Sequence, residues 1–177
     1  MKNLALILLL MCCLNSCKSS KRVAEKKSSS SKVSKVVTKD FGTSENTTVD
    51  STINYIIDYA KQFDGVKYKY GGTTKKGMDC SGLVTTAFKS EKILLPRSTG
   101  DLALEGNWID IKEVQKGDLL FFATEKNSRN VNHVGLVTDS RPGYVEFIHA
   151  TTSAGVIISN LAERYWYFAF VQARRIL

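Results

Sequence analysis

The stretch GMDCSGLVTTAF, residues 77–88, decides how this chain is expected to fold and act. A Gly-rich turn comes before it, and apolar residues then take up a helical spacing from Leu83 to Phe88. A helix is therefore predicted to begin beside Cys80. The N-terminus of a helix presents unpaired backbone N–H groups and the positive end of the helix dipole. Both favour a thiolate, so the sequence places Cys80 where a thiol can be reactive.

The neighbours of Cys80 suit the same interpretation. Asp79 and Ser81 are able to cap the first turn of the helix, because their side-chain oxygens can accept hydrogen bonds from backbone N–H groups. Gly82 allows another segment to pack closely behind the cysteine. Taken by itself, a cysteine at a helix start can equally be a small buried residue, so both readings stay open at this point.

The other three of the four cysteines lie in the first seventeen residues, MKNLALILLLMCCLNSC. Lys2 supplies a positive start, and an apolar run follows from Leu4 to Leu14. This run is typical of a secretory signal and is too short to cross a hydrocarbon layer of about 30 Å. Leu14 to Cys17 resembles a bacterial lipobox, which predicts a signal peptide over residues 1–17 and a lipid on Cys17. An uncleaved apolar leader is the alternative.

Residues 18–49 are rich in Ser, Lys and Thr and show no sustained helical or strand period. Such a composition buries too little surface to offset the entropy of ordering, which predicts a flexible tether. Residues 1–50 hold nine basic and four acidic residues and so carry most of the net charge of +8. A basic leader suits an anionic membrane or wall surface. Without a recognisable nucleic-acid-binding motif, no nucleic-acid partner is expected.

From residue 50 to 177 the pattern is that of one folded domain. Residues 50–63 carry an apolar helical face with Asp50 or Ser51 as N-cap, a helix follows Cys80, and residues 98–104 read as a short capped helix. After residue 117 the pattern changes to strands over LLFFAT (119–124), NHVGLVTD (132–139), YVEFIHA (144–150), AGVIIS (154–159) and YFAFVQARRI (167–176). Helices followed by strands predict an α+β fold, in which N-terminal helices pack on a mostly antiparallel C-terminal sheet.

The only two histidines of the chain, His133 and His149, lie in two of these predicted strands, joined by a turn at residues 140–143. A hairpin can place the two imidazoles side by side. One of them can act as general base for Cys80 while the other orients it, as in a cysteine protease. Buried structural histidines and a metal site made of the thiol and both imidazoles are the alternatives, but no pair among the three has the short spacing of a structural zinc site.

The chain resembles the NlpC family of papain-like bacterial cell-wall cysteine peptidases over most of residues 53–175. The order and spacing of the matching stretches carry this resemblance. They are YKYGG (68–72), GMDCSGLV (77–84), LPRST (95–99), KGDLLFF (116–122), NHVGLV (132–137), FIHATTSAGV (147–156) and YWYFAFVQARRIL (165–177).

By position, the resemblance implies that Cys80 is the nucleophile, His133 the general base and His149 the orienting residue. It also implies an oxyanion role for Tyr68, shared with the backbone N–H of Cys80. Further oxyanion or substrate contacts are expected from Asp79, Ser81, Ser98 and Thr99, although helix capping explains the last two equally well. Trp108, Trp166 and the aromatic run after Tyr165 are expected to belong to the core and the sheet rather than to a sugar-binding platform.

The resemblance further implies hydrolysis of peptidoglycan stem peptides at the γ-D-glutamyl–diamino acid bond through a thioacyl-enzyme, with no metal or organic cofactor. A related N-acetylmuramoyl-L-alanine amidase, another thiol acyl-transfer enzyme and a non-catalytic wall-binding domain on the same fold are the alternatives. With the leader, it predicts an exported monomer, anchored by its lipid to a membrane. Lys18 after Cys17 favours the outer membrane, facing the periplasm.

Overall fold

The computed structural model describes residues 43–177, with side chains from residue 47 on. The predicted signal peptide, the lipidation site at Cys17 and the tether up to residue 42 therefore lie outside the described residues. In the described part no helix is long and apolar enough to span a bilayer.

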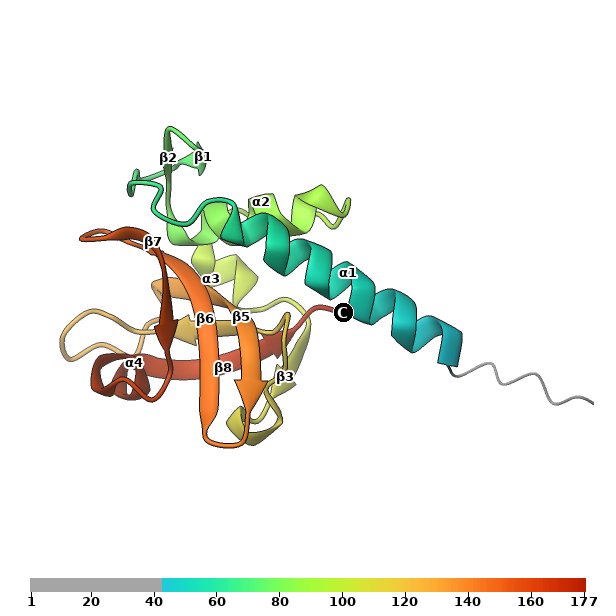
Figure 1. Cartoon of the computed structure of the whole chain (residues 1–177). Helices are drawn as coiled ribbons and strands as arrows, with labels where there is room; N and C mark the ends of the chain where they lie inside the picture. Colours follow the sequence, from blue (N-terminus) through green and yellow to red (C-terminus); the bar gives the residue numbers. More distant parts are fainter. Residues whose placement is uncertain (1–42) are drawn as a thin grey trace, which may run out of the picture. The chain divides into compact units, whose positions relative to one another are not determined.

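Two helices precede the main sheet. Helix α1 spans Thr43–Lys61 and α2 spans Cys80–Ser90, and the two pack against each other (Figure 1). Between them lies a small antiparallel hairpin of β1, Thr73–Thr74, and β2, Gly77–Met78. A single turn of helix, α3, spans Thr99–Leu102. The helix beginning at Cys80 and the short helix after Ser98 were both predicted, whereas the hairpin was not.

Helix α1 begins seven residues earlier than predicted, so Asp50 and Ser51 do not cap it. The hydroxyl of Ser51 instead donates to the carbonyl of Thr48, 2.8 Å away, as it would inside a helix. The residues from Thr47 to Ser51 are exposed and carry no apolar stripe, so the hydrophobic pattern could not reveal them. Once the packed part of a helix exists, extending it adds one hydrogen bond per residue, which accounts for the extra turns.

The main sheet has six strands, in the order β3-β8-β4-β5-β6-β7, and every neighbouring pair is antiparallel. This confirms the predicted α+β class with a mostly antiparallel sheet. The strands are β3 Asn107–Ile109, β4 Leu119–Phe122, β5 His133–Arg141, β6 Tyr144–Thr151, β7 Gly155–Asn160 and β8 Phe170–Arg175, with a 3-10 turn, η1, at Ile111–Glu113.

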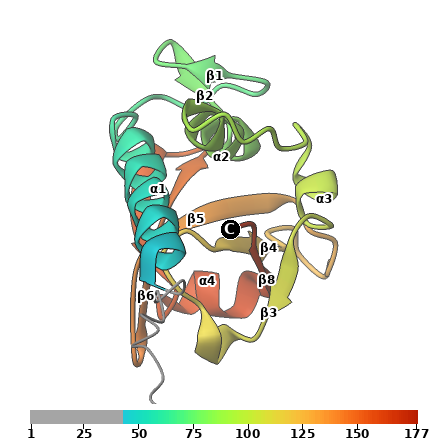
Figure 2. The same ribbon diagram turned by 90° about the vertical axis from the view of Figure 1, so that its right-hand side faces the viewer.

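Both faces of the sheet are covered, which explains why β4 reads as an unbroken apolar run. Leu119 and Phe121 pack with α1 and α2 on one face, while Leu120 and Phe122 pack on the other with Trp166 of helix α4, Arg164–Ala169. Figure 2 shows α1 and α2 on one side of the strands and α4 on the other.

Helix α4, Arg164–Ala169, occupies residues that were assigned in part to a strand. Trp166 and Ala169, three residues apart, are buried against the sheet, whereas Tyr165, Tyr167 and Phe168 are 57%, 66% and 68% exposed. Aromatic residues favour strands, and that preference suggested the wrong element here. This run and Trp108 were expected in the core and the sheet: Trp166 is buried and Trp108 lies in strand β3, but Trp108 is 61% exposed and adds little to the core.

Candidate active site

Cys80 is the first residue of α2, and Asp79 is its N-cap in an extended conformation. The Asp79 carboxylate accepts a hydrogen bond from the backbone N–H of Gly82 at 2.7 Å, which closes the first turn. Cys80 is a free cysteine, 7% exposed, and lines a cleft of about 480 Å³. Within residues 43–177 its backbone N–H has no hydrogen-bond partner, so it remains available to a ligand.

An ion pair between Asp79 and Arg97 holds the start of α2, and with it the nucleophile, in place. The second carboxylate oxygen of Asp79 accepts from the backbone N–H of Gly71 at 2.7 Å and from the guanidinium of Arg97 at 2.8 Å. The same guanidinium donates to the Ser81 hydroxyl at 2.6 Å. Asp79 and Ser81 are buried, bonded in this way and absent from the lining of the cleft, so they support the start of α2, and their contact with a substrate stays a prediction.

Gly82 is required by the segment that packs behind the nucleophile. A Cβ atom at this position would lie 2.1 Å from the carbonyl oxygen of Gly72 and 2.8 Å from the Asp79 carboxylate. The first neighbour is backbone, and the second is a side chain held in place by the hydrogen bonds that its carboxylate accepts. The glycine after the Cys–Ser pair thus lets the loop of Tyr68–Gly72 sit against the start of α2.

The two histidines form a hydrogen-bonded pair on neighbouring strands. His133 begins β5 and His149 lies near the end of β6, and the distance from His133 Nε2 to His149 Nδ1 is 2.9 Å. The Nε2 atom of His149 lies 3.0 Å from the hydroxyl of Ser159 on β7. The predicted side-by-side placement of the imidazoles is therefore observed, and the chain of hydrogen bonds ends in a serine that was not predicted.

Aromatic side chains enclose this pair. The Trp166 ring stacks on His133 with centroids 5.4 Å apart and meets the His149 ring edge-on at 4.5 Å. Burial lowers the pKa of His133 from 6.5 to about 4. Burial, and secondly the neighbouring His133, lower the pKa of His149 to about 3. Both imidazoles are consequently neutral at neutral pH, the form that can accept a proton.

One tautomer assignment that fits these hydrogen bonds leaves a nitrogen of His133 free to act as base. If His133 Nε2 carries its proton and donates to His149 Nδ1, then His149 Nε2 carries the other proton and donates to Ser159 Oγ. His133 Nδ1 is then an unprotonated acceptor. In this tautomer Ser159 holds His149, and His149 holds His133 ready to remove a proton from Cys80.

Cys80 and His133 line the same cleft, together with Tyr68, Trp166 and Ser159. No hydrogen bond joins the thiol to His133 in the described part of the chain; Cys80 Sγ lies 3.7 Å from the hydroxyl of Thr99 instead. Such contacts commonly tighten only when substrate is bound. A rotation of the thiol away from Thr99 would be needed for the proton transfer.

Tyr68 also lines the cleft, and its hydroxyl has no hydrogen-bond partner among residues 47–177. Burial, followed by the negative charge of Cys80, raises its pKa above 10, so the hydroxyl keeps its proton as a donor. With the free N–H of Cys80 it can stabilise an oxyanion. Tyr70, by contrast, is 89% exposed.

The remaining expected contacts divide between Thr99 and Ser98. Thr99 lies beside the thiol, as the hydrogen-bond distance above shows. Ser98 is exposed and caps α3, accepting from the backbone N–H of Asp101 at 3.1 Å. The capping explanation therefore fits Ser98, while Thr99 is close enough to contact a substrate.

Sequence reasoning missed two residues that shape the site, Ser159 and Asn132. The side-chain oxygen of Asn132 accepts hydrogen bonds from the backbone N–H of Thr124 at 2.9 Å and from its hydroxyl at 3.0 Å. These bonds connect the loop after β4 to the residue directly before His133. A polar residue directly before His133 was the only available signal. Among residues 47–177, no group of three His, Cys, Asp or Glu side chains is arranged to hold a metal ion.

A thiol at a helix N-terminus, a neutral imidazole pair and two free donors form a site for acyl transfer. The thiol supplies the nucleophile, the imidazole moves its proton, and the donors face the developing oxyanion. No contact with a redox group or phosphate is required for these steps.

Residues 65–175 match the model of the NlpC/P60 family. The chain is 44% identical over 114 residues to the probable endopeptidase NlpC homolog of Haemophilus influenzae, covering 64% of this chain and 57% of that protein. It is 41% identical over 123 residues to the murein DD-endopeptidase MepS/murein LD-carboxypeptidase of Escherichia coli, which covers 69% of this chain and 62% of that protein. A γ-D-glutamyl-L-lysine dipeptidyl-peptidase of Bacillus cereus is 36% identical over 96 residues, covering 54% and 29%.

The chain thus spans less than two thirds of the length of each of these relatives. Among solved structures, an NlpC/P60 family protein from Bacillus cereus superposes with a TM-score of 0.64 at 32% identity. The superposition covers 71% of this chain and 40% of that one.

Proposed function

Because the chain belongs to the NlpC/P60 family, we propose that it is a cysteine endopeptidase that cuts peptidoglycan stem peptides between γ-D-glutamate and the diamino acid. The observation that carries this proposal is the single cleft shared by Cys80, at a helix N-terminus, and a neutral His133 held by His149. The similarity to a γ-D-glutamyl-L-lysine dipeptidyl-peptidase supports the choice of bond.

Each step has a residue to perform it. His133 Nδ1 takes the proton of Cys80, and the sulfur attacks the γ-carbonyl carbon, while the N–H of Cys80 and the hydroxyl of Tyr68 face the oxyanion. The C–N bond breaks as His133 returns the proton to the leaving amine, which leaves a thioester on Cys80. Water, deprotonated by His133, then releases the acid and restores the thiol.

The test uses the full chain, purified in detergent, as wild type and as Cys80→Ala. Each protein is incubated with disaccharide tripeptide and tetrapeptide muropeptides, and the products are read by mass spectrometry. Loss of the fragment that starts at the diamino acid, by wild type alone, is the expected result. Separation of sugar from peptide would favour the amidase alternative, and binding to sacculi without any cleavage would favour a non-catalytic wall-binding domain.

A second candidate is hydrolysis of a bond between two D-configured centres in the cross-links that join stem peptides. The 41% identity to a murein DD-endopeptidase favours it. The same residues would act, and only the acyl group held in the cleft would differ. Cross-linked dimeric muropeptides distinguish the two candidates, since this activity converts dimers to intact monomers while the first shortens the stem.

We also propose that the protein is a lipoprotein, anchored through Cys17 to the outer membrane and facing the periplasm, and that it acts as a monomer. The support is the apolar run that ends at Leu14-Asn15-Ser16-Cys17, followed by Lys18. Processing should be blocked by globomycin, and Cys17→Ala should abolish lipid labelling. An unlipidated mature protein in the soluble fraction would contradict the anchor, and sedimentation of a dimer would contradict the monomer.

A further inference from the structure

A second hollow, of about 680 Å³, opens beside the catalytic cleft. It lies between α4 and the loop that follows β4, and we call it the α4 hollow; its lining includes Thr124, Glu125, Arg129, Arg164, Tyr165 and Phe168. Thr124 and Tyr165 line the catalytic cleft as well. A ligand whose reacting bond lies at Cys80 can therefore extend into this hollow without crossing a wall of buried residues.

The charges of the α4 hollow are unpaired. Within residues 47–177 neither Arg129 nor Arg164 makes an ion pair or a side-chain hydrogen bond, and the same holds for Glu125. Other arginines of the domain are engaged: Arg97 pairs with Asp79, Arg141 with Asp139 and Arg175 with Asp118. Two guanidinium groups and one carboxylate are thus available to a ligand in one place.

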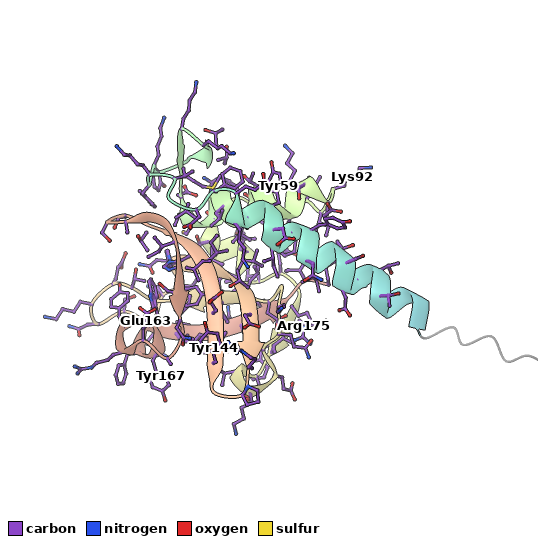
Figure 3. All side chains as sticks on the ribbon, in the orientation of Figure 1. Tyr59, Lys92, Tyr144, Glu163, Tyr167 and Arg175 are labelled. Carbon is purple, nitrogen blue, oxygen red and sulfur yellow. The ribbon has the colours of Figure 1, made fainter. Side chains whose placement is uncertain are left out.

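The hollow also has aromatic walls that the core does not need. Tyr165 and Phe168 are more than half exposed, although the rest of α4 is held down by Trp166 and Ala169. Figure 3 shows Glu163 just before this helix and Tyr167 on its outer side, away from the sheet. Exposed aromatic rings beside unpaired charges are typical of surfaces that bind a ligand.

We propose that the α4 hollow is a subsite for the free end of the substrate's diamino acid, where a carboxylate stands beside an ammonium group. Arg129 and Arg164 bind the carboxylate, since guanidinium groups match its two oxygens, and Glu125 faces the ammonium group. The aromatic rings contact the aliphatic part of the side chain. The inference rests on the proposed function and adds the substrate specificity of the same site.

This arrangement selects by charge. A substrate whose diamino-acid carboxylate is amidated, or whose diamino acid is lysine, offers no anion to the two arginines. Such a substrate leaves both guanidinium groups without a partner and places its ammonium group near them. A free carboxylate is therefore preferred, and the preference lies in binding and not in the chemical step.

The test compares three disaccharide tetrapeptides that differ only at the diamino acid: meso-diaminopimelate, the same residue with its free carboxylate amidated, and L-lysine. Wild type is expected to cleave the free acid with a kcat/KM about tenfold above the other two, mostly through KM. Arg129→Gln and Arg164→Gln are each expected to lower kcat/KM for the free acid severalfold and to leave the amidated substrate within about twofold. Glu125→Gln should lower kcat/KM for all three substrates alike, because each of them carries the ammonium group.

Arg141→Gln is the matched control, because this exposed arginine lies outside both hollows. Equal cleavage of free and amidated substrates by wild type would overturn the inference. So would arginine variants that lower kcat/KM equally for both substrates. If wild type cleaves none of the three, the proposed function fails separately. The inference is then decided by calorimetric binding of the same ligands to Cys80→Ala, in which the preference for the free acid must appear and must disappear in Cys80→Ala/Arg164→Gln.

Discussion

The nucleophile and its base are held by opposite kinds of interaction. Cys80 sits on a polar clamp, where the Asp79 carboxylate joins Arg97, Gly71 and Gly82. The histidines sit among rings, with Trp166 against both and with one line of hydrogen bonds that ends at Ser159. We refer to these regions as the polar clamp and the aromatic box.

The difference follows from what each group must do. The thiolate gains from backbone N–H groups that point at it, and such groups stay oriented only if the loop and the helix start are tied by charge-assisted bonds. An imidazole that must begin neutral gains from the removal of water and of charges, which an aromatic box achieves. Breaking the polar clamp should therefore cost stability, whereas breaking the aromatic box should cost activity.

The largest effect is expected from His133→Gln, which removes the base while keeping an uncharged polar side chain. We expect kcat/KM for muropeptide cleavage to fall by about 10³-fold or more. Its melting temperature should stay close to that of wild type, because no charge is left unpaired. A melting temperature lowered as strongly as the activity would mean that the aromatic box is primarily structural.

The polar clamp is tested by Asp79→Ala, which removes the N-cap of α2 and leaves Arg97 and two backbone N–H groups without their acceptor. Since Arg97 is itself 44% exposed, we expect the free energy of unfolding to fall by about 3 kcal/mol, less than for a fully buried pair. Chemical denaturation measures this. The control is Asp139→Ala, whose two ion pairs are on the surface and should contribute less than about 1 kcal/mol. Equal losses in the two variants would contradict the distinction drawn here.

Acid should weaken the aromatic box. The folded pKa values of about 4 and about 3 for His133 and His149 lie below their ordinary 6.5. The unfolded chain therefore binds more protons, and stability that is present above pH 6.5 is lost as the pH falls towards these folded values. Between pH 6.5 and 5 we expect each histidine to lower the free energy of unfolding by roughly 2 kcal/mol. Denaturation curves of wild type and His149→Gln measure it, and the variant should show the shallower decline.

The smallest effect is expected from Ser159→Ala, which removes the hydrogen-bond partner of His149 Nε2 and leaves the nucleophile and base in place. We expect kcat to fall by about tenfold and KM to stay unchanged, with about 1 kcal/mol lost in stability. Ser140→Ala is the control: it removes a hydrogen bond that the hydroxyl donates to the Val114 carbonyl, far along β5. It should lose about as much stability as Ser159→Ala and keep full activity. Ser159→Thr should recover part of kcat if the hydroxyl fixes the tautomer, and it would not if the serine only fills space.

The parts of the site that the sequence predicted are those set by local pattern. The helix beginning at Cys80 follows from apolar spacing after a Gly-rich turn, and the imidazole pair follows from two histidines on strands joined by a short turn. The first needs only local spacing and the second only a short turn between consecutive strands, so periodicity and turn chemistry were sufficient. The antiparallel sheet followed in the same way.

What the sequence did not reveal depends on contacts between distant segments. Ser159 is ordinary in a strand and becomes the partner of His149 only because β6 and β7 pair in one register. The engagement of Asp79 by Arg97 crosses eighteen positions and gives Asp79 a supporting role that the sequence did not indicate. The exposure of the other aromatic residues of α4 likewise depends on the packing of Trp166 against the sheet, which turns the rest of the helix towards solvent.

The contact between Gly82 and the Gly72 carbonyl has a consequence for how this sequence can evolve. A side chain at position 82 would push against the loop that carries Tyr68, so the loop and the start of α2 cannot change their spacing independently. Selection on the nucleophile is thereby also selection on the loop of the oxyanion tyrosine. Insertions should accumulate instead in the exposed connection around Gly143, where an added side chain would meet no atom within 4 Å.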